Sequence, residues 1–292
     1  MVKLLKIFIG ILILIMTPLK VKADDVLQIR GSDTMLNLIQ KMAETYVKKN
    51  PAQNLAVSGG GSGVGISGLR NRTVDIADAS REITKREIID LESKGVQVNR
   101  IIIGRDCITI IVNRKNKVAK LTTDQVGAIF RGDITNWKDV GGNDMEITLY
   151  GRQSNSGTYF DLREFILKGE YSVKMRSMNG NSQIIESIKV DESGIGYVGR
   201  GYVADSQDMK AVSIATGGST NYINPLELTE SNADTYPISR ALNQYIGGKP
   251  QGAIKDFIMF ELSDEGQKIC EEMGFFKVSA EEMEQNNQVL AG

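Results

Sequence analysis

The chain has 292 residues, of which 35 are basic, 36 are acidic and none is histidine. The lack of histidine excludes Ser-His-Asp and Cys-His catalytic triads and every zinc or iron site that uses an imidazole ligand. A formal net charge of −1 excludes the strongly basic surface that is typical of nucleic-acid binding.

The N-terminus has the pattern of a secretory signal peptide. Lys3 and Lys6 precede an apolar core at residues 7–16, and a Val-Lys-Ala sequence ends at Ala23. The apolar core is too short to span a bilayer comfortably, so we predict export to the periplasm with cleavage after Ala23. Lysines also follow the core, which leaves an N-terminal membrane anchor as the alternative.

Cleavage makes the chain more acidic and leaves enough residues for two domains. The first 23 residues contain four of the 35 basic residues and no acid, so 31 basic and 36 acidic side chains remain, a net charge of −5. We therefore expect no nucleic-acid partner, and any anion site must be built from local donors. The remaining 269 residues exceed what one hydrophobic core usually organises.

The two cysteines, Cys107 and Cys270, leave two interpretations open. In an oxidising compartment they pair if their Cα atoms come close, and otherwise each is a small buried hydrophobic residue. The carboxylates show no spacing typical of a metal cage, so we predict neither a metal ion nor a cofactor.

Strand and helix patterns alternate along the first third of the chain. The predicted elements, in chain order, are strand 26–30, helix 35–49, strand 54–58, a helix after 66, strand 74–77 and helix 85–93. The last helix begins with Thr84-Lys85-Arg86-Glu87, which has the form of a capping box. This alternation predicts an α/β fold with mostly parallel strands.

A long apolar, β-branched run at residues 101–113 predicts a strand that crosses between two lobes. The elements predicted after it are helix 124–130, strand 147–150, helix 159–167, strands 194–198 and 240–246, and helices 252–260 and 264–273. We interpret the strand at 194–198 as the return crossing. The segment after Ala280 is predicted to be a helix or a loose tail.

Three segments rich in hydroxyl groups and glycine stand where a strand ends and a helix begins. They are Gly-Ser-Asp-Thr-Met at 31–35, Gly-Gly-Gly-Ser-Gly-Val-Gly at 59–65 and Arg-Gln-Ser-Asn-Ser-Gly-Thr-Tyr-Phe at 152–160. A forked cation, short hydroxyl donors and free backbone N–H groups at a helix N-terminus are what a tetrahedral oxyanion needs. In open α/β sheets ligands bind at the carboxyl ends of strands, so these segments predict one anion site.

Each segment also has a structural interpretation. Ser32 and Thr34 have the place of ordinary N-caps of the following helix. The run at 59–65 reads as a flexible turn, and it lacks the Lys-Ser/Thr end of a nucleotide-binding P-loop. Arg81 reads as a partner of Glu82 or Asp78 in a salt bridge.

Together with four further motifs, these segments resemble the substrate-binding proteins of phosphate ABC transporters. The further motifs are VDIADASRE at 74–82, DQVGAIFRGDITNW at 124–137, GIGYVG at 194–199 and LSDEGQKICEEMGFF at 262–276. The likeness covers most of the chain after the signal peptide. It implies a two-lobed periplasmic binding protein, type II-like, that holds phosphate in the cleft between its lobes and is not an enzyme. The implied partner is the membrane permease of the transporter, and we expect a monomer.

The resemblance also implies a domain division and a set of phosphate contacts. The expected first lobe comprises residues 24–111 and 197–292, and the second lobe comprises residues 112–196. The implied phosphate contacts are Ser32, Thr34, the Met35 N–H, Ser62, Ser80, Arg81, Arg152, Ser156, Gly157 and Thr158.

Two positions depart from the pattern of some family members. Those members have an aspartate where this chain has Ser80 and an acid where it has Ser154. A carboxylate accepts a hydrogen bond from protonated phosphate and repels sulfate, and here Asp33 or Asp78 is the candidate acceptor. Another oxyanion such as sulfate therefore stays an alternative ligand. A secreted phosphoryl-transfer enzyme, with Ser62 or Ser156 as nucleophile, is the alternative from another class.

Overall fold

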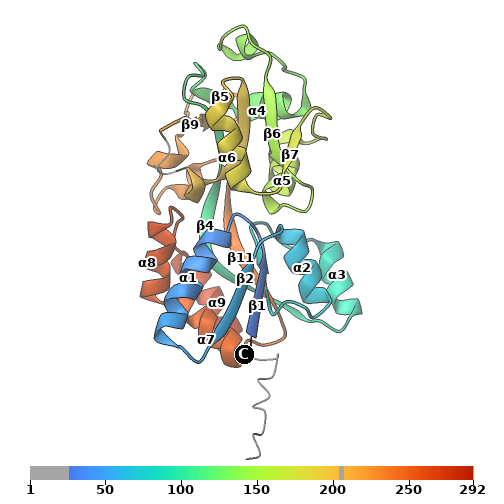
Figure 1. Cartoon of the computed structure of the whole chain (residues 1–292), viewed down its shortest axis with the longest axis vertical. Helices are drawn as coiled ribbons and strands as arrows, with labels where there is room; N and C mark the ends of the chain where they lie inside the picture. The colour runs from blue at the N-terminus through green and yellow to red at the C-terminus, as the bar shows by residue number, and fades with distance from the viewer. Residues whose placement is uncertain (1–25, 204–206, 292) are drawn as a thin grey trace, which may run out of the picture.

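A computed structural model describes residues 26–203 and 207–291, and in it two α/β lobes lie end to end (Figure 1). The predicted signal peptide and its cleavage site lie outside these residues. One continuous strand path runs through the molecule in the order β2-β1-β3-β11-β4-β8-β6-β7, with β9 also paired to β4. The predicted α/β, two-lobed fold is confirmed.

The first lobe is a five-stranded sheet with helices on both faces. Strands β1 and β2, and β1 and β3, pair in parallel, whereas β11 is antiparallel to both β3 and β4. Its elements are β1 (Val26–Gly31), α1 (Leu36–Lys49), β2 (Asn54–Ser58), α2 (Ser62–Arg70), β3 (Ile76–Ala79), α3 (Lys85–Ser93), β4 (Val98–Asn113), β11 (Ser239–Gly247), α7 (Gly252–Glu261), α8 (Asp264–Glu272) and α9 (Ala280–Ala291).

The second lobe repeats the plan around the far half of β4. Strands β8 and β9 are antiparallel to β4, and β6 is parallel to β8 and β7. Its elements are β5 (Lys120–Thr122), α4 (Thr123–Arg131), η2 (Trp137–Val140), β6 (Thr148–Arg152), α5 (Gly157–Asp161), η3 (Leu162–Leu167), β7 (Arg176–Met178), α6 (Asn181–Val190), β8 (Gly194–Gly199), η4 (Arg200–Tyr202), β9 (Met209–Ala211), β10 (Ser213–Ala215), η5 (Pro225–Glu227) and η6 (Ala233–Thr235).

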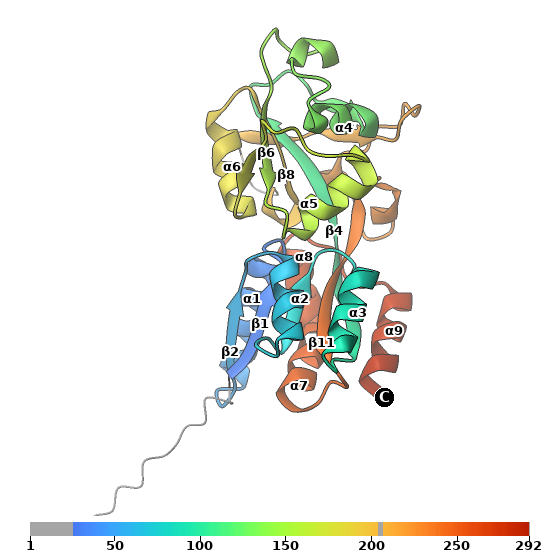
Figure 2. The same cartoon turned by 90° about the vertical axis from the view of Figure 1, so that its right-hand side faces the viewer.

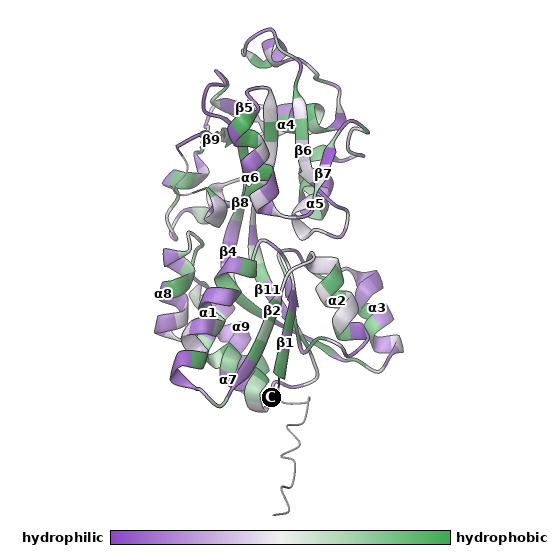
Figure 3. Ribbon diagram, in the orientation of Figure 1, coloured by the Kyte–Doolittle hydropathy of each residue, from purple (hydrophilic) through white to green (hydrophobic). Residues whose placement is uncertain are grey.

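Apolar residues concentrate in the strands of both lobes, while hydrophilic and hydrophobic residues alternate along the covering helices (Figure 3). One apolar cluster packs between the first-lobe sheet and α1, α7 and α8, and another lies under α2 and α3. The second lobe has its main cluster around α4 and η3 and a smaller one under α6. Because both faces of each sheet are covered, the strands read as almost continuous apolar runs in the sequence.

Strand β4 crosses from one lobe to the other, as the sequence predicts (Figure 2). Its first half contributes Ile101 and Ile103 to the first-lobe core, and its second half contributes Ile108 and Ile110 to the second-lobe core. The capping box at Thr84 is also confirmed, with both reciprocal hydrogen bonds formed. The C-terminal segment is a helix, α9.

The packing differs from the expected return crossing at residues 194–198. Strand β8 lies inside the second-lobe sheet between β4 and β6. The chain beyond it stays with the same lobe, since Val212, Ile214 and Tyr236 belong to the second-lobe core. We therefore propose that the return lies at the start of β11, near Ser239, and that the expected first-lobe range of 197–292 begins about 40 residues too early. The sequence pattern that would keep this part of the chain in the second lobe is weak, because β9 and β10 are only three residues long.

Candidate anion-binding site

The predicted site residues come from four loops at which the two lobes face each other. Residues after β1, β2 and β3 lie on the first lobe, and residues 152–158 follow β6 on the second. All ten predicted residues are buried. The carboxyl ends of parallel strands lie at the same edge of a sheet, which explains why segments far apart in sequence converge here.

Arg152 is a buried cation whose hydrogen-bonding capacity is only partly used. It is 2% exposed, and its Nη2 donates to the Asp33 carboxylate across the lobes and, at 2.9 Å, to the Asn179 carbonyl. Its Nε and Nη1 have no hydrogen-bond partner within residues 26–203 and 207–291. A buried cation with two unused N–H groups is costly unless an anion takes them.

Hydroxyl groups from both lobes meet beside this arginine. The Thr34 and Thr158 Oγ1 atoms lie 3.1 Å apart in an interlobe hydrogen bond. The Ser62 Oγ accepts from the Ser80 N–H at 3.2 Å, while the Ser80 Oγ is buried without a partner in the described part of the chain. Each of these hydroxyls is a short donor of the kind that binds an oxyanion.

Gly157 shows how closely the lobes approach. A Cβ at this position would lie 2.5 Å from the Ser62 Oγ and 2.8 Å from the Ser80 Oγ. Gly61, with φ of +95°, is in a similar position, because a Cβ there would lie 2.7 Å from the carbonyl oxygen of Asn155. The lobes are therefore in contact, and only glycine leaves room for the hydroxyls between them.

The helix ends leave the predicted hydroxyls of the first lobe unused for capping. Helix α1 has Met35 at its N-cap with no side-chain capping bond, so Ser32 and Thr34 are not the ordinary caps of the alternative interpretation. Helix α2 likewise begins at Gly61 without a side-chain cap. On the second lobe Ser156 does cap, because its Oγ accepts from the Tyr159 N–H at 3.4 Å.

Two predicted contacts have other partners. The Met35 N–H donates to the Ser32 carbonyl at 3.1 Å. The Arg81 guanidinium makes two hydrogen bonds to the Glu87 carboxylate, at 2.8 and 2.7 Å, and lies over the Phe160 ring. The structural interpretation of Arg81 as a salt-bridge residue therefore fits, but with Glu87 in place of Glu82 or Asp78.

The two candidate acceptor acids, Asp33 and Asp78, also have hydrogen-bond partners within the protein. Both Asp33 oxygens accept hydrogen bonds, one from Arg152 and one from the Gly60 N–H at 2.9 Å. The Asp78 carboxyl turns into the first lobe, where its Oδ1 accepts from Gln244 at 3.1 Å. Burial raises the pKa of Asp78 to about 7, although the Gln244 hydrogen bond lowers it. Asp33 thus orients Arg152, and Asp78 belongs to a separate cluster.

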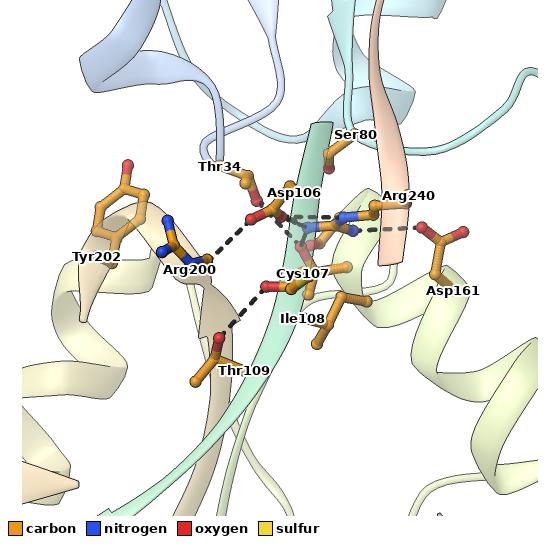
Figure 4. A network of polar contacts seen from close by, with 12 residues as sticks. Thr34, Ser80, Asp106, Cys107, Ile108, Thr109, Asp161, Arg200, Tyr202 and Arg240 are labelled. Carbon is orange, nitrogen blue, oxygen red and sulfur yellow. Dashed lines mark hydrogen bonds and ion pairs between the residues drawn. The ribbon is translucent and has the colours of Figure 1, made fainter. Parts of the chain in front are cut away.

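Sequence reasoning missed a second arginine at the interface. Arg240, the second residue of β11, pairs with Asp106 at 2.9 Å and with Asp161 at 3.3 Å (Figure 4). Burial raises the pKa of Asp161 to about 6, and Arg240 opposes that shift. The sequence does contain a clue to this arginine. Asp106 is the one acid inside the apolar run at 101–113, and a buried acid requires a charged partner.

Asn181, at the start of α6, is a further buried group that the sequence did not single out. Both polar atoms of its amide lack hydrogen-bond partners among the residues described. It lies beside the Tyr202 hydroxyl, which donates to the Asp33 carbonyl at 2.6 Å. Asn181 therefore stands next to the Asp33–Arg152 pair with its amide unused.

The remaining predictions concern cysteines, metals and the membrane. Cys107 and Cys270 are both buried and free in the described structure, which confirms the hydrophobic interpretation. Across residues 26–203 and 207–291, His, Cys, Asp and Glu form no group of three or more that could hold a metal ion. No helix within those ranges combines the length and apolarity needed to cross a bilayer.

Comparison with known proteins agrees with this geometry. Residues 20–265 match the family model described as a PBP superfamily domain. The phosphate-binding protein PstS of Borreliella burgdorferi is 31% identical over 264 residues, covering 87% of this chain and 91% of that protein. PstS of Pseudomonas aeruginosa is 29% identical, covering 86% and 82%.

A solved structure of a putative phosphate ABC transporter substrate-binding protein from Clostridium perfringens, with bound phosphate, superposes with a TM-score of 0.77. It is 28% identical to this chain and matches 87% of this chain and 100% of its own. The chain therefore belongs to the PBP superfamily and, within it, to the substrate-binding proteins of phosphate ABC transporters.

Proposed function

We propose that this protein binds inorganic phosphate between its two lobes and delivers it to the membrane permease of an ABC transporter. The PstS relatives, named as phosphate-binding proteins, and the phosphate-bound C. perfringens structure support this ligand. We also propose that the protein acts as a monomer in the periplasm and performs no catalysis.

The observation that carries the proposal is the set of unused buried donors at the interface. Arg152 offers Nε and Nη1, and Ser80 offers its hydroxyl, all without acceptors among the described residues. An oxyanion supplies acceptors for all three, and hydrogen bonds to an ion are about twice as strong as neutral ones. Phosphate would thus replace its lost hydration with donors from both lobes.

The alternative of a phosphoryl-transfer enzyme has less support in the geometry. Its candidate nucleophiles are Ser62 and Ser156, and both hydroxyl oxygens accept a backbone N–H bond. Such a bond withdraws electron density from the oxygen, and a serine nucleophile needs a base beside it. The sequence offers no histidine for that purpose.

A ligand panel tests the function directly. Purified protein is titrated by calorimetry and thermal shift with phosphate, arsenate, sulfate and molybdate. We expect phosphate to raise the melting temperature, because a ligand that binds only the native state stabilises it. A shift with sulfate or molybdate and none with phosphate would replace the proposed ligand. Release of phosphate from a phosphomonoester, lost in Ser156→Ala, would establish the enzyme instead.

A further inference from the structure

Arg240 lies where the chain passes between the lobes. It stands directly opposite Asp106 in the antiparallel pairing of β11 and β4, at the point where β4 passes from the first core to the second. Its Nε and Nη2 donate to the Asp106 Oδ2 at 3.1 and 2.9 Å. Asp106 is fully buried, and its other oxygen accepts from the Arg200 N–H at 2.9 Å.

The same guanidinium reaches hydroxyls of both lobes. Its Nη2 donates to the Thr158 Oγ1 at 3.0 Å. The same atom lies 3.4 Å from the Thr34 Oγ1 (Figure 4). Its Nη1 donates to the Asp161 Oδ2 at 3.3 Å, one helical turn beyond Thr158. Arg240 therefore touches the first lobe through Thr34 and the second lobe through Thr158 and Asp161.

These contacts determine what the two hydroxyls do. A threonine hydroxyl has one proton to donate and two lone pairs to accept with. One N–H of Nη2 is directed at Asp106, and the other points toward lone pairs of Thr158 and, at longer range, Thr34. The protons of the two hydroxyls are therefore directed away from Arg240. Because Thr34 and Thr158 face each other, one proton serves the bond between them and the other is free for an anion.

The cost of this arrangement indicates that it serves more than stability. Buried ion pairs often contribute nothing over apolar residues of similar size, because both charges lose their hydration. Asp106 and Asp161 are buried, and the side chain of Arg240 is only 7% exposed. Contact with two predicted ligand hydroxyls supplies a functional reason for keeping the charges.

We propose that Arg240 is a positioning residue for phosphate, which orients the Thr34–Thr158 hydroxyl pair so that its free proton points toward the anion, and which joins the two lobes when they close. Asp106 and Asp161 fix its guanidinium plane. This inference rests on the proposed phosphate-binding function and adds a residue that the resemblance did not imply.

A double-mutant cycle tests it. Phosphate affinity is measured by calorimetry for wild type, Arg240→Lys, Thr158→Val and the double variant. Lysine keeps the charge beside Asp106 but has no fork that reaches Asp161 and both hydroxyls. We expect Arg240→Lys to weaken phosphate binding about tenfold in the wild-type background and less than about twofold with Thr158→Val. Arg105→Gln is the matched control, because Arg105 lies on β4 and pairs with Asp234 away from the site.

Every outcome decides the matter. Arg240→Lys with wild-type affinity, or with equal loss in both backgrounds, would overturn the positioning role while leaving phosphate binding intact. If Arg240→Lys does not fold, Asp161→Asn replaces it in the same cycle, and here too equal loss in both backgrounds would overturn the role. Failure of the wild-type protein to bind phosphate would instead remove the proposed function itself.

Discussion

Two buried regions of this protein contain polar atoms without hydrogen-bond partners among the described residues. In one region most of these atoms are donors, and in the other they are acceptors. At the interface between the lobes donors predominate, on Arg152 and Ser80, beside the Asn181 amide with one donor and one acceptor. Inside the first lobe they are acceptors, the Gln244 Oε1 and the Glu261 Oε2. There the Gln244 amide nitrogen already donates to both Asp78, at 3.1 Å, and Glu261, at 3.0 Å.

This difference indicates which partner would satisfy the unpaired atoms of each region. A region with spare donors needs an acceptor, and an anion provides several at once. A region with a spare carboxyl oxygen, here on Glu261, needs a proton, which the acid takes up itself. Burial, followed by the charge of Asp78, raises the pKa of Glu261 well above its usual value. We therefore infer that the interface is a ligand site, whereas the Asp78–Gln244–Glu261 cluster is a structural element whose acids retain protons because they are buried.

Removing Arg152 should have the largest effect on the donor-rich region. In Arg152→Met the two free N–H donors are lost, and each hydrogen bond to a charged group contributes about 1.5–3 kcal/mol. We expect phosphate affinity to fall by about 10²- to 10⁴-fold, measured by calorimetry. Asp33 also loses its cationic partner, so the melting temperature without phosphate is recorded alongside.

Arg176→Met is the matched control for Arg152. Arg176 lies on β7, directly beside β6, but its Nη1 donates to the Tyr150 hydroxyl at 3.0 Å and its side chain is exposed. We expect unchanged phosphate affinity. Equal losses in the two variants would mean that general positive charge attracts the ligand, and that the interface holds no directed site.

Ser80→Ala should have the next largest effect. It removes one buried hydroxyl that has no protein acceptor in the described residues, while the Ser80 backbone bond to Ser62 remains. We expect phosphate affinity to fall about tenfold with little change in the melting temperature of the free protein. The exposed Ser154→Ala serves as the control. A large loss of stability without loss of affinity would move Ser80 from the ligand site to the structural framework.

The two regions were not equally visible in the sequence. The donor-rich loops are local patterns of a few residues at strand–helix junctions, so the chain itself indicates the segments that contain Thr34, Ser62 and Arg152 as an anion site. The individual contacts follow from the family resemblance. Asp78 is one of two candidate acceptors, with Asp33, of a hydrogen bond from protonated phosphate. Its burial against Gln244 is not visible in the sequence, because the partner is 166 residues away. Contacts of that separation follow only from the order of strands in the sheet, and the chain-local pattern does not contain it.

The same reason explains why the path of the chain through the second lobe is not predicted from the sequence. The strand at 194–198 was recognised, but its position between β4 and β6 depends on pairing that no local pattern specifies. Helix α6 was missed, although Ile184, Ile185 and Ile188 are buried, because it begins with no side-chain cap. The long strand β4 was predicted correctly because its apolar run is unusually long.

Asp78→Asn should change the pH dependence of stability. The pKa of Asp78 is about 7 in the folded protein, against about 3.9 for an aspartate in an unfolded chain. The folded state therefore retains a proton that the unfolded state releases, and this contribution to stability is full below about pH 4 and is lost as the pH rises to about 7. Asparagine has no such proton to lose.

Urea unfolding between pH 5 and 8 measures this difference. We expect the stability of Asp78→Asn relative to wild type to improve as the pH rises from 5 to 7, by at most about 1.4 kcal/mol per pH unit. The exposed Asp90→Asn is the control of the same residue type and should show no such trend. A constant difference across the range would mean that Asp78 is ionised in the fold, against the proton-bound cluster.

Arg81→Met should have the smallest effect on phosphate, because Arg81 lies near the interface with its charge already matched. Its guanidinium forms a two-point pair with Glu87, and that pair together with the capping bonds lowers the pKa of Glu87 against the effect of burial. We expect phosphate affinity within about twofold of wild type and a stability loss of about 1–2 kcal/mol, measured by calorimetry and urea unfolding. Glu87→Gln, which weakens the same pair from the other side, should lower stability likewise. If Arg81→Met instead lost tenfold or more in affinity, the guanidinium would have to leave Glu87 when the anion binds. Pairing with a carboxylate would then not distinguish an arginine that binds the ligand from one that is structural. Arg152 also pairs with a carboxylate, that of Asp33.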